Sequence, residues 1–481
     1  MTRPTRHAIA WDDLDFADRT KTEAEMRRIW DICHTGRRCF NLCDAFPRLF
    51  DLIDRSVTGE FDSVAVEDYH EVADACTLCD ICFMTKCPYV PPHEFNVDFP
   101  HVMLRYRAVD LREKKISTWQ RELAKTDRNG RLAGRVAPHA NWANNRRNGL
   151  TRPAMEKMLG IDRRAALPSY HGRTFVMRSK RSVPPVDYSA PAVGRKAILY
   201  ATCFVNYSNP HIGEATRAVL ARNGVETEVM YPRCSNMPQL EQGNLAAVTR
   251  SACEVAAILD PRIDEGYDVV ALVPSCALML KFEWPLIVPS NSAVQKLSKA
   301  TFDISEYMVD IARREGFAPG LSPLEGGVTV HLACHARAQN IGQTAVEMLR
   351  LLPGSGHLRD RAVLRPWRAL GRAQGKFRDR RQGRSAGRPP SAAERKAVPF
   401  LRVSACRHAY PSGDRDGGKK AKTCPNTRCI QSNSLPALTG SQDRGLKEKR
   451  GPNGRHNITT LPAPVDARGH SACRRIRRRA A

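Results

Sequence analysis

Cysteine is the residue type whose number and spacing in this chain promise chemistry. There are 16 cysteines among 481 residues, and seven of them lie between Cys33 and Cys87. The run CTLCDICFMTKCP, from Cys76 to Pro88, reads C-x2-C-x2-C-x4-C-P. Three such closely spaced cysteines can place three thiolates on one cubane iron–sulfur cluster, and a fourth followed by proline ligates the other cluster in two-cluster ferredoxins. The run predicts a [4Fe-4S] site; the alternatives are buried cysteines or zinc, which more often uses two separated C-x-x-C pairs.

An earlier run, CHTGRRCFNLC from Cys33 to Cys43, is typical of the partner run with one ligand missing. Gly36 stands where C-x2-C-x2-C-x3-C has its second cysteine, and glycine has no side chain to bind iron. A three-iron cluster, an iron with a water ligand and an empty site are the alternatives. Imidazole can replace thiolate at iron, so His34 is a candidate substitute, although we favour an exposed polar role for it.

In two-cluster ferredoxins each cluster takes three cysteines from one run and the fourth from the other run. This crossed pattern divides the seven cysteines into two sets. The complete set, predicted to hold a [4Fe-4S] cluster, is Cys43, Cys76, Cys79 and Cys82. The incomplete set, predicted to hold a [3Fe-4S] cluster or none, is Cys33, Cys39 and Cys87. We predict no catalytic residue, because an electron carrier makes no covalent change in a substrate.

A second group of cysteines follows predicted strands farther along the chain. Apolar stretches at 196–202, 225–232 and 267–276 alternate with helix patterns, which favours a parallel sheet with crossover helices. Side chains at the carboxyl ends of parallel strands converge above the sheet. The cysteines at such positions, the last of them in a second α/β unit, are predicted metal ligands: Cys203, Cys234, Cys276 and Cys334. The alternative is a core role, because free cysteine is often buried.

The segments before this α/β unit favour helices. Apolar spacing predicts short helices at 22–33, 44–54 and 66–75, and a long amphipathic helix from near Asp98 to about residue 123. Residues 126–190 indicate a connector with short helices. The N-terminus lacks the apolar run of a signal peptide, and no stretch is long enough for a membrane span. Closely spaced cysteines suit a reducing compartment, so a cytoplasmic location is expected.

The net charge of +26 belongs almost entirely to the last quarter of the chain. Residues 354–481 contain 31 Lys or Arg against 8 Asp or Glu, a net +23, and only about 13% Leu, Ile, Val or Phe, which is the composition of disorder. The abrupt loss of periodicity near Gly354 leads us to hypothesise a frameshift or sequencing error there. The alternative is a basic arm, but its few aromatic residues do not favour stacking on nucleic-acid bases.

Three stretches resemble a family of bacterial iron–sulfur oxidoreductases: CFNLCDAFPRLFDLID, CTLCDICFMTKCPYVPPHEFNVDFPHVMLRYRAVDLRE and MPQLEQGN. The family is related to the C subunit of anaerobic glycerol-3-phosphate dehydrogenase and to the cysteine-rich (CCG) subunits of heterodisulfide reductase, and some relatives are rubrerythrin-associated. The similarity covers roughly residues 20–353. It implies a two-cluster ferredoxin domain, two CCG modules, and electron transfer from a partner dehydrogenase or reductase, often toward a quinone pool.

The chain departs from that family at several ligand positions. Cys234-Ser235-Asn236 stands where the family has Cys-Cys-Gly, and Met279 ends an element that the family closes with cysteine. The second module keeps Cys334 and then loses its pattern. The resemblance therefore places CCG-type cofactor chemistry in doubt for this chain, while the first cubane site stays intact.

Together these features predict an α+β multidomain chain. Its expected parts are an α-helical two-cluster ferredoxin domain (1–105), a helical linker (106–190), a cysteine-rich α/β module (191–300), the start of a second module (301–353) and a disordered Arg-rich tail (354–481). The expected function is that of an oxidoreductase component, which passes electrons between a partner dehydrogenase or reductase and an acceptor such as quinone or rubrerythrin. Association with the inner face of the membrane would go through a partner. The alternatives are a zinc-stabilised binding module with a nucleic-acid-binding tail, and a degenerate non-functional copy of the family.

Overall fold

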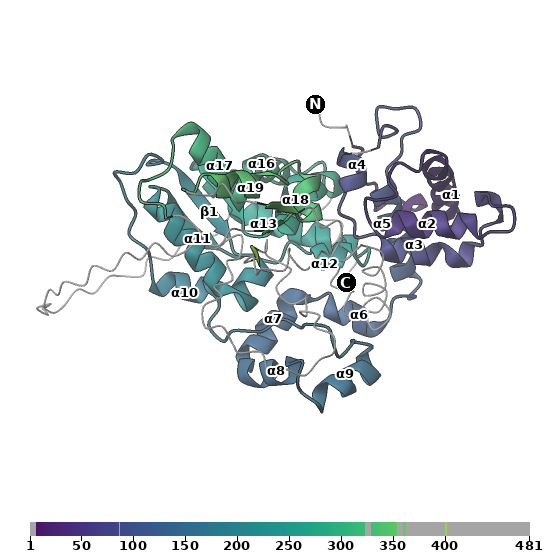
Figure 1. Cartoon of the computed structure of the whole chain (residues 1–481), viewed down its shortest axis with the longest axis horizontal. Coiled ribbons are helices and arrows are strands. Elements are labelled where there is room, and N and C mark those ends of the chain that lie inside the picture. The colour runs from purple at the N-terminus through teal and green to yellow at the C-terminus, as the bar shows by residue number, and fades with distance from the viewer. Residues whose placement is uncertain (1–5, 86, 323–328, 354–358, 362–399, 402–481) are drawn as a thin grey trace, which may run out of the picture.

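The computed structural model describes residues 6–85, 87–322, 329–353, 359–361 and 400–401. A group of helices forms one end of the molecule, an α/β part built on a parallel sheet forms the other, and α6 to α9 lie below their junction in the view of Figure 1. This mixture of helix and sheet agrees with the predicted α+β class. None of the helices in the described ranges is long and apolar enough to cross a membrane.

The N-terminal end is helical because short amphipathic segments bury one face each. Three residues of the first helix, Met26, Ile29 and Trp30, lie at helical spacing and are at most 1% exposed. The Trp30 ring packs on that of Tyr69, with 4.9 Å between the ring centroids. The helices of this end are α1 (Arg19–Gly36), α2 (Ala45–Asp54), α3 (Tyr69–Ala75), α4 (Ile81–Thr85) and α5 (Phe99–Arg112), with 3-10 turns η1 (Asp15–Ala17), η2 (Phe61–Ser63) and η3 (Val66–Asp68).

The long helix predicted from Asp98 to about residue 123 is two helices. Its start is as expected, because the Asp98 carboxylate accepts the backbone N–H of His101 at 3.1 Å. The helix ends at Arg112, since Lys114 takes a left-handed conformation with φ of 60°. Ser117 then starts α6 with a reciprocal capping box. The connector holds α6 (Thr118–Leu123), α7 (Thr126–Arg135), α8 (Ala137–Asn144), α9 (Thr151–Leu159) and α10 (Phe175–Arg181).

The α/β part is built on a four-stranded parallel sheet in the order β2-β1-β3-β4. After the exposed Lys196, residues 197–200 of the inner strand β1 are apolar and completely buried, as a strand covered on both faces requires. The strands are β1 (Lys196–Tyr200), β2 (Glu226–Met230), β3 (Tyr267–Ala271) and β4 (Thr301–Asp303). The first three are the strands that the sequence predicts, and β4 extends the sheet just past the boundary predicted at residue 300.

Helices of very different length connect and cover these strands. The longer ones are α11 (Pro210–Arg222), α13 (Leu245–Asp264), α16 (Ser292–Ala300) and α17 (Ile304–Arg314). The short ones are α12 (Met237–Leu240), α14 (Pro274–Leu278), α15 (Trp284–Ile287) and the π-helices η4 (Phe204–Ser208) and η5 (Met279–Glu283). Single π-helical turns are often found at functional sites, and η4 follows Cys203 directly.

The second α/β unit consists of β5 (Thr329–His331), α18 (Cys334–Ala338) and α19 (Thr344–Arg350). Strand β5 pairs in parallel with β6 (Arg359–Arg361) and β7 (Phe400–Leu401). Five residues of the segment predicted to be disordered therefore form strands. The rest of 354–481 lies outside the described residues, so the frameshift stays a hypothesis.

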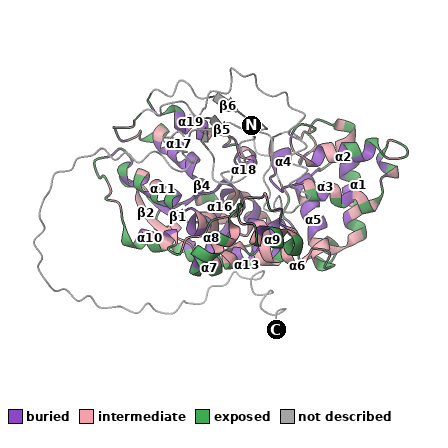
Figure 2. Ribbon diagram, turned by 60° about the horizontal axis from the view of Figure 1, so that its bottom comes forward, coloured by how far each residue is buried: buried purple, intermediate pink, exposed green. Residues whose placement is uncertain are grey.

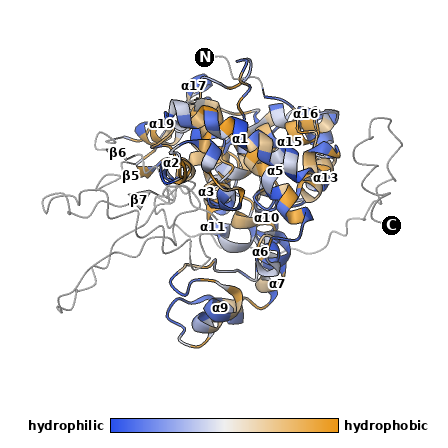
Figure 3. Ribbon diagram, turned by 90° about the vertical axis from the view of Figure 1, so that its right-hand side faces the viewer, coloured by the Kyte–Doolittle hydropathy of each residue, from blue (hydrophilic) through white to orange (hydrophobic). Residues whose placement is uncertain are grey.

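One continuous set of buried apolar side chains runs from the helical end into the sheet. Figure 2 shows buried residues on the inward faces of both parts, and Figure 3 shows the matching apolar stripes. The two parts approach each other closely at Gly243, where φ is 73° and an added Cβ atom would lie 2.4 Å from the Ala108 nitrogen of α5. Only glycine lets this loop pack on the helix backbone, which explains the glycine of MPQLEQGN.

Candidate metal centre and a second cysteine group

The loop between α3 and α4, together with the first turn of α4, carries three buried cysteines: Cys76, Cys79 and Cys82. Leu78 and Asp80 both take left-handed conformations, with φ of 46° and 61°. These two turns curl the loop, and the Leu78 N–H points at the Cys76 sulfur at 3.4 Å. Burial, reinforced by the nearby charges of Cys79, Cys43 and Cys76, raises the pKa of the Cys82 thiol.

The charges that act on the N-terminal thiols indicate which of these cysteines lie near one another. The pKa of Cys43 is raised first by burial and then by Cys79 and Cys76, so Cys43 lies beside the loop cysteines. The pKa of Cys33 is raised first by burial and then by Cys87 and Cys39. Cys82 is influenced by Cys39 as well as by Cys79, Cys43 and Cys76, so the two predicted sets adjoin one another, and the cysteines' role as ligands remains a prediction.

Gly36 is the last residue of α1, and the ring of Tyr89 lies beside it. A Cβ atom at Gly36 would be 3.4 Å from Tyr89 Cε2, an ordinary contact distance. His34 does not fill the missing ligand position. Its Nδ1 lies 2.9 Å from Arg37 Nη2 and its Nε2 lies 3.6 Å from Glu60 Oε2, so its ring nitrogens face surface charges. Its side chain is polar, as predicted, but only 12% exposed.

The N-terminal site offers thiol groups as its possible metal donors. Among the described residues, no three His, Cys, Asp or Glu side chains are grouped tightly enough to hold one metal ion. A zinc ion keeps its sulfurs about 2.3 Å away, and hence within roughly 4 Å of one another. A cubane takes each thiolate at a different iron and spreads the sulfurs more widely. The seven N-terminal cysteines are free thiols, partly or fully buried, and thiolates are the donors that iron–sulfur clusters use.

A buried arginine supports the loop. Arg107 of α5 is 6% exposed. Its guanidinium donates to the carbonyl of Ala73, to that of Cys76 at 2.6 Å, and to that of Glu241 in the α/β part at 3.2 Å. Sequence reasoning missed this residue. The sequence feature that could have identified it is the position of this charged residue, three residues after Leu104 and on the apolar face of the predicted helix.

A second buried arginine joins the loop to the α/β part. Arg6 binds Asp98 through Nε at 2.8 Å, Asp80 at 3.0 Å and Glu283 of η5 at 3.0 Å. His101 lies beside the same acids, with Nδ1 3.0 Å from Asp98 Oδ2 and Nε2 3.5 Å from Glu283 Oε2. Five charged groups from four segments therefore meet at the junction of the two parts.

The pKa values in this network diverge because burial and charge pairing compete. Burial raises the pKa of Asp80 to about 8 against the attraction of Arg6. The pKa of Glu283 falls to about 2 in spite of burial, because Arg6 and His101 favour its charged form. Burial and Arg6 oppose the charge of His101, yet Asp98 and Glu283 raise its pKa to about 9. The network is nearly charge-balanced when Asp80 is protonated.

The second cysteine group lies where the carboxyl ends of β1, β2 and β3 meet. The Sγ atoms of Cys203 and Cys234 are 3.6 Å apart. Ser235 donates its hydroxyl to Cys276 Sγ at 3.2 Å. The hydrogen bond with Cys203 lowers the pKa of Cys234, and the N–H of Asn236 contributes in the same direction. The hydrogen bond between the two sulfurs and burial both raise the pKa of Cys203. The predicted convergence of these three strand-end positions is what the structure shows.

The connector supplies residues that sequence reasoning missed. Thr126 Oγ1, at the start of α7, lies 3.5 Å from Cys203 Sγ and 3.6 Å from Cys234 Sγ. The Asp127 carboxylate accepts the hydroxyls of Tyr207 and Tyr231 at 2.9 and 3.0 Å. No local pattern marks Thr126 or Asp127, because their partners lie about 80 to 110 residues later in the chain.

Cys334 does not join this group. It forms a sulfur–sulfur hydrogen bond with Cys79, which is the largest influence on the pKa of each thiol. Helix α18 accordingly packs on α4, and the two helices are neighbours in Figures 1 and 2. Cys334 thus lies beside the N-terminal loop, and the expectation that it is a metal ligand at the equivalent position of the second unit stays a prediction.

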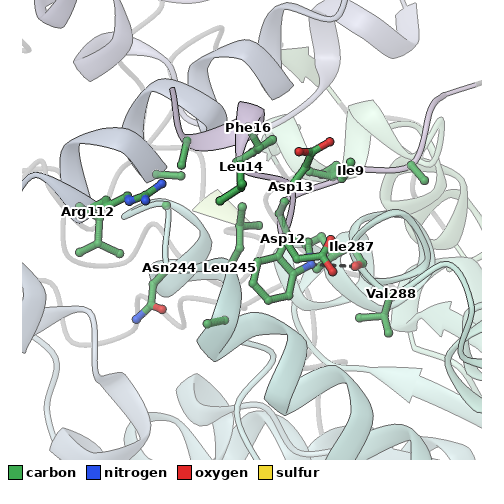
Figure 4. Close-up of a pocket in the computed structure, with 18 of the residues that line it drawn as sticks. Ile9, Asp12, Asp13, Leu14, Phe16, Arg112, Asn244, Leu245, Ile287 and Val288 are labelled. Carbon is green, nitrogen blue, oxygen red and sulfur yellow. Dashed lines mark hydrogen bonds between the residues drawn. The ribbon is translucent and has the colours of Figure 1, made fainter. Parts of the chain in front are cut away.

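A cavity of about 910 Å³ opens at the junction of the two parts. The N-terminal segment, α5 and the residues around Leu245 and Ile287 line it, and Trp11 Nε1 donates to the Ile287 carbonyl at 3.1 Å (Figure 4). Its lining is apolar apart from a few residues such as Asp12 and Arg112, and it contains no cysteine. It is therefore separate from both cysteine groups.

The chain has recognisable relatives. It is 25% identical over 234 residues to the C subunit of anaerobic glycerol-3-phosphate dehydrogenase from Escherichia coli strain K12, covering 48% of this chain and 57% of that protein. It is 27% identical over 145 residues to lactate utilization protein A of Bacillus pumilus, covering 29% and 58% of the two chains. It is 32% identical over 88 residues to citrate utilization protein B of Escherichia coli, covering 18% and 21%.

The chain is thus similar over part of its length to a dehydrogenase subunit and to proteins of lactate and citrate utilization. The chain spans somewhat more than half the length of the first two of these relatives. No family profile matches it, and no solved structure matches it.

Proposed function

We propose that this chain is an iron–sulfur electron-transfer subunit. One [4Fe-4S] cluster would be held by the complete set, Cys43, Cys76, Cys79 and Cys82. A [3Fe-4S] cluster, or none, would occupy the incomplete set of Cys33, Cys39 and Cys87. The observation that supports the proposal is that Cys43 lies near Cys76 and Cys79, and Cys33 near Cys87 and Cys39, as expected from the crossed ferredoxin pattern.

The protein's part in this function is to hold the thiolates and to set the environment of the cluster. When bound, the cluster supplies reversible one-electron transfer. The Leu78 N–H donates toward the Cys76 sulfur, and hydrogen bonds to sulfur are one of the means by which proteins set cluster potentials. Arg107 fixes the Cys76 carbonyl, and the buried position of the loop limits access of water.

The electron donor would be a partner dehydrogenase or reductase, and the acceptor a quinone or a rubrerythrin. The named relatives are a dehydrogenase subunit and proteins of lactate and citrate utilization, which supports a partner of the oxidoreductase class. We propose a cytoplasmic location, with any contact to the membrane made through that partner. The described part of the chain has no membrane-spanning helix.

Anaerobic reconstitution of the full chain tests the proposal. We expect a brown protein with bound iron and sulfide, and a reduced-state signal in electron paramagnetic resonance. Cys79→Ser should lose about half or more of the iron, whereas Cys276→Ser, in the other cysteine group, should retain the N-terminal iron. A colourless protein with about one zinc ion per chain would instead favour the zinc-stabilised module.

A further inference from the structure

The closest contact in the second cysteine group is between Cys203 and Cys234. Their sulfur atoms lie 3.6 Å apart. A disulfide joins its sulfurs at about 2.05 Å, so an approach of about 1.5 Å brings this pair to bonding distance. Both residues sit in loops that leave parallel neighbouring strands, β1 and β2, which holds the two sulfurs in register.

The surroundings of the pair distinguish its two members. Cys234 is 2% exposed and accepts the backbone N–H of Asn236 at 3.4 Å. Asn236 can present that N–H because it holds a left-handed conformation, with φ of 62°, at the glycine position of the family's motif. The Thr126 hydroxyl lies within hydrogen-bond distance of both sulfurs. Such donors stabilise a thiolate. Cys203 is the more exposed residue of the two.

The residues present do not fit the metal site that the family implies. Ser235 replaces a cysteine and turns its hydroxyl to Cys276, and Met279 is completely buried in the core. In the described ranges no third ligand-type side chain completes a metal group around the pair. Two sulfurs in direct contact also leave no space between them for the irons of a cluster.

We propose that Cys203 and Cys234 form a reversible dithiol–disulfide site that exchanges with low-molecular-weight thiols and disulfides. The Cys203 sulfur attacks a small disulfide while its proton passes by way of the neighbouring Cys234 to the thiolate that is released, and a mixed disulfide forms. The Cys234 thiolate then attacks the Cys203 sulfur, the second small thiolate leaves, and the Cys203–Cys234 bond forms. Two protein thiols are oxidised, one disulfide is reduced to two thiols, and the released thiolates take up the two protons.

The test uses the full-length protein purified anaerobically and equilibrated with glutathione and glutathione disulfide at a series of ratios. Samples are quenched with acid, alkylated, digested and mapped by mass spectrometry, and iron is counted in parallel. We expect one linked peptide pair joining Cys203 to Cys234, which disappears in excess glutathione. Cys276→Ser should keep the link. Thr126→Val should slow its formation about fivefold, because a donor to the Cys234 thiolate is lost.

The proposal is overturned if Cys203 and Cys234 stay unlinked and fully alkylated in the wild-type protein at every ratio. It is equally overturned if a metal ion blocks both thiols and is released by Cys203→Ser. The first of these results comes from peptide mapping of the wild-type protein alone. The test therefore does not depend on whether a variant folds. Iron held by the N-terminal cysteines is measured separately, so the failure of one proposal is distinguishable from the failure of the other.

Discussion

Restoring the missing ligand at Gly36 is the most direct test of the N-terminal site. Gly36 ends α1, and a Cβ atom there would lie 3.4 Å from Tyr89 Cε2 and 3.8 Å from Tyr89 Oη, so Gly36→Cys introduces no clash. Replacing a helical glycine with cysteine gains roughly 0.3 kcal/mol of helix propensity. We therefore expect the free energy of unfolding of the iron-free protein to change by less than about 0.5 kcal/mol.

The effect of the substitution should appear in the iron content. If the wild-type site holds a three-iron cluster, Gly36→Cys should raise the content from about seven to about eight irons per chain. If the wild-type site is empty, the content should rise from about four to about eight. In the first case an oxidised-state signal in electron paramagnetic resonance should be replaced by an additional reduced-state signal.

Gly36→Ala is the matched control, since it adds the Cβ atom without a thiol. Both variants are reconstituted anaerobically beside the wild type, and iron, sulfide and resonance spectra are compared. If Gly36→Cys holds no more iron than Gly36→Ala and gives no new signal, the interpretation of Gly36 as a vacant ligand position is wrong.

Three further predictions follow from the packing around the site. Gly243→Ala should lower the free energy of unfolding by about 3 kcal/mol, through overpacking and left-handed strain. The control Gly266→Ala is also at positive φ but has no atom within 4 Å of its new Cβ, so it should lower the free energy of unfolding by only about 1 kcal/mol. Urea titration of both variants separates the effect of the clash from that of the strain. His101→Asn should destabilise the protein by up to roughly 3 kcal/mol at pH 6, the equivalent of a pKa raised from 6.5 to about 9. This contribution is fully present below pH 6.5 and is lost as pH rises through 9, so a deficit that is constant from pH 6 to 10 in urea titrations would contradict it. Arg107→Met leaves buried carbonyls, including that of Cys76, without their donor, and should cost about 3 kcal/mol; unchanged unfolding in urea and unchanged retention of iron would show that the guanidinium does not support the loop.

The sequence by itself determined the parts of this protein that depend on local spacing. The two cysteine runs specify their own grouping, because each set is built from a short loop and one crossing cysteine, and the absent thiol at Gly36 is visible without any structure. The buried parts of β1 and β3 were equally predictable, since a strand buried on both faces is a continuous apolar stretch, whereas β2 is a half-buried edge strand that the sequence predicts from its place between two helix patterns. The convergence of Cys203, Cys234 and Cys276 then follows from parallel pairing.

Tertiary structure alone decided which distant residues meet these sites. Arg6 and Glu283 are separated by 277 positions, and Thr126 and Cys234 by 108, so no periodicity links them. The break after Arg112 was missed because apolar spacing continues through it, while a left-handed residue and a new capping box end one helix and start the next. Cys334 occupies the predicted strand-end position, but the docking of α18 on α4 sends its sulfur to Cys79. The spacing of cysteines along the chain determines which ligands one loop can supply. The packing of one unit against another depends on surfaces formed by residues that are far apart in the sequence.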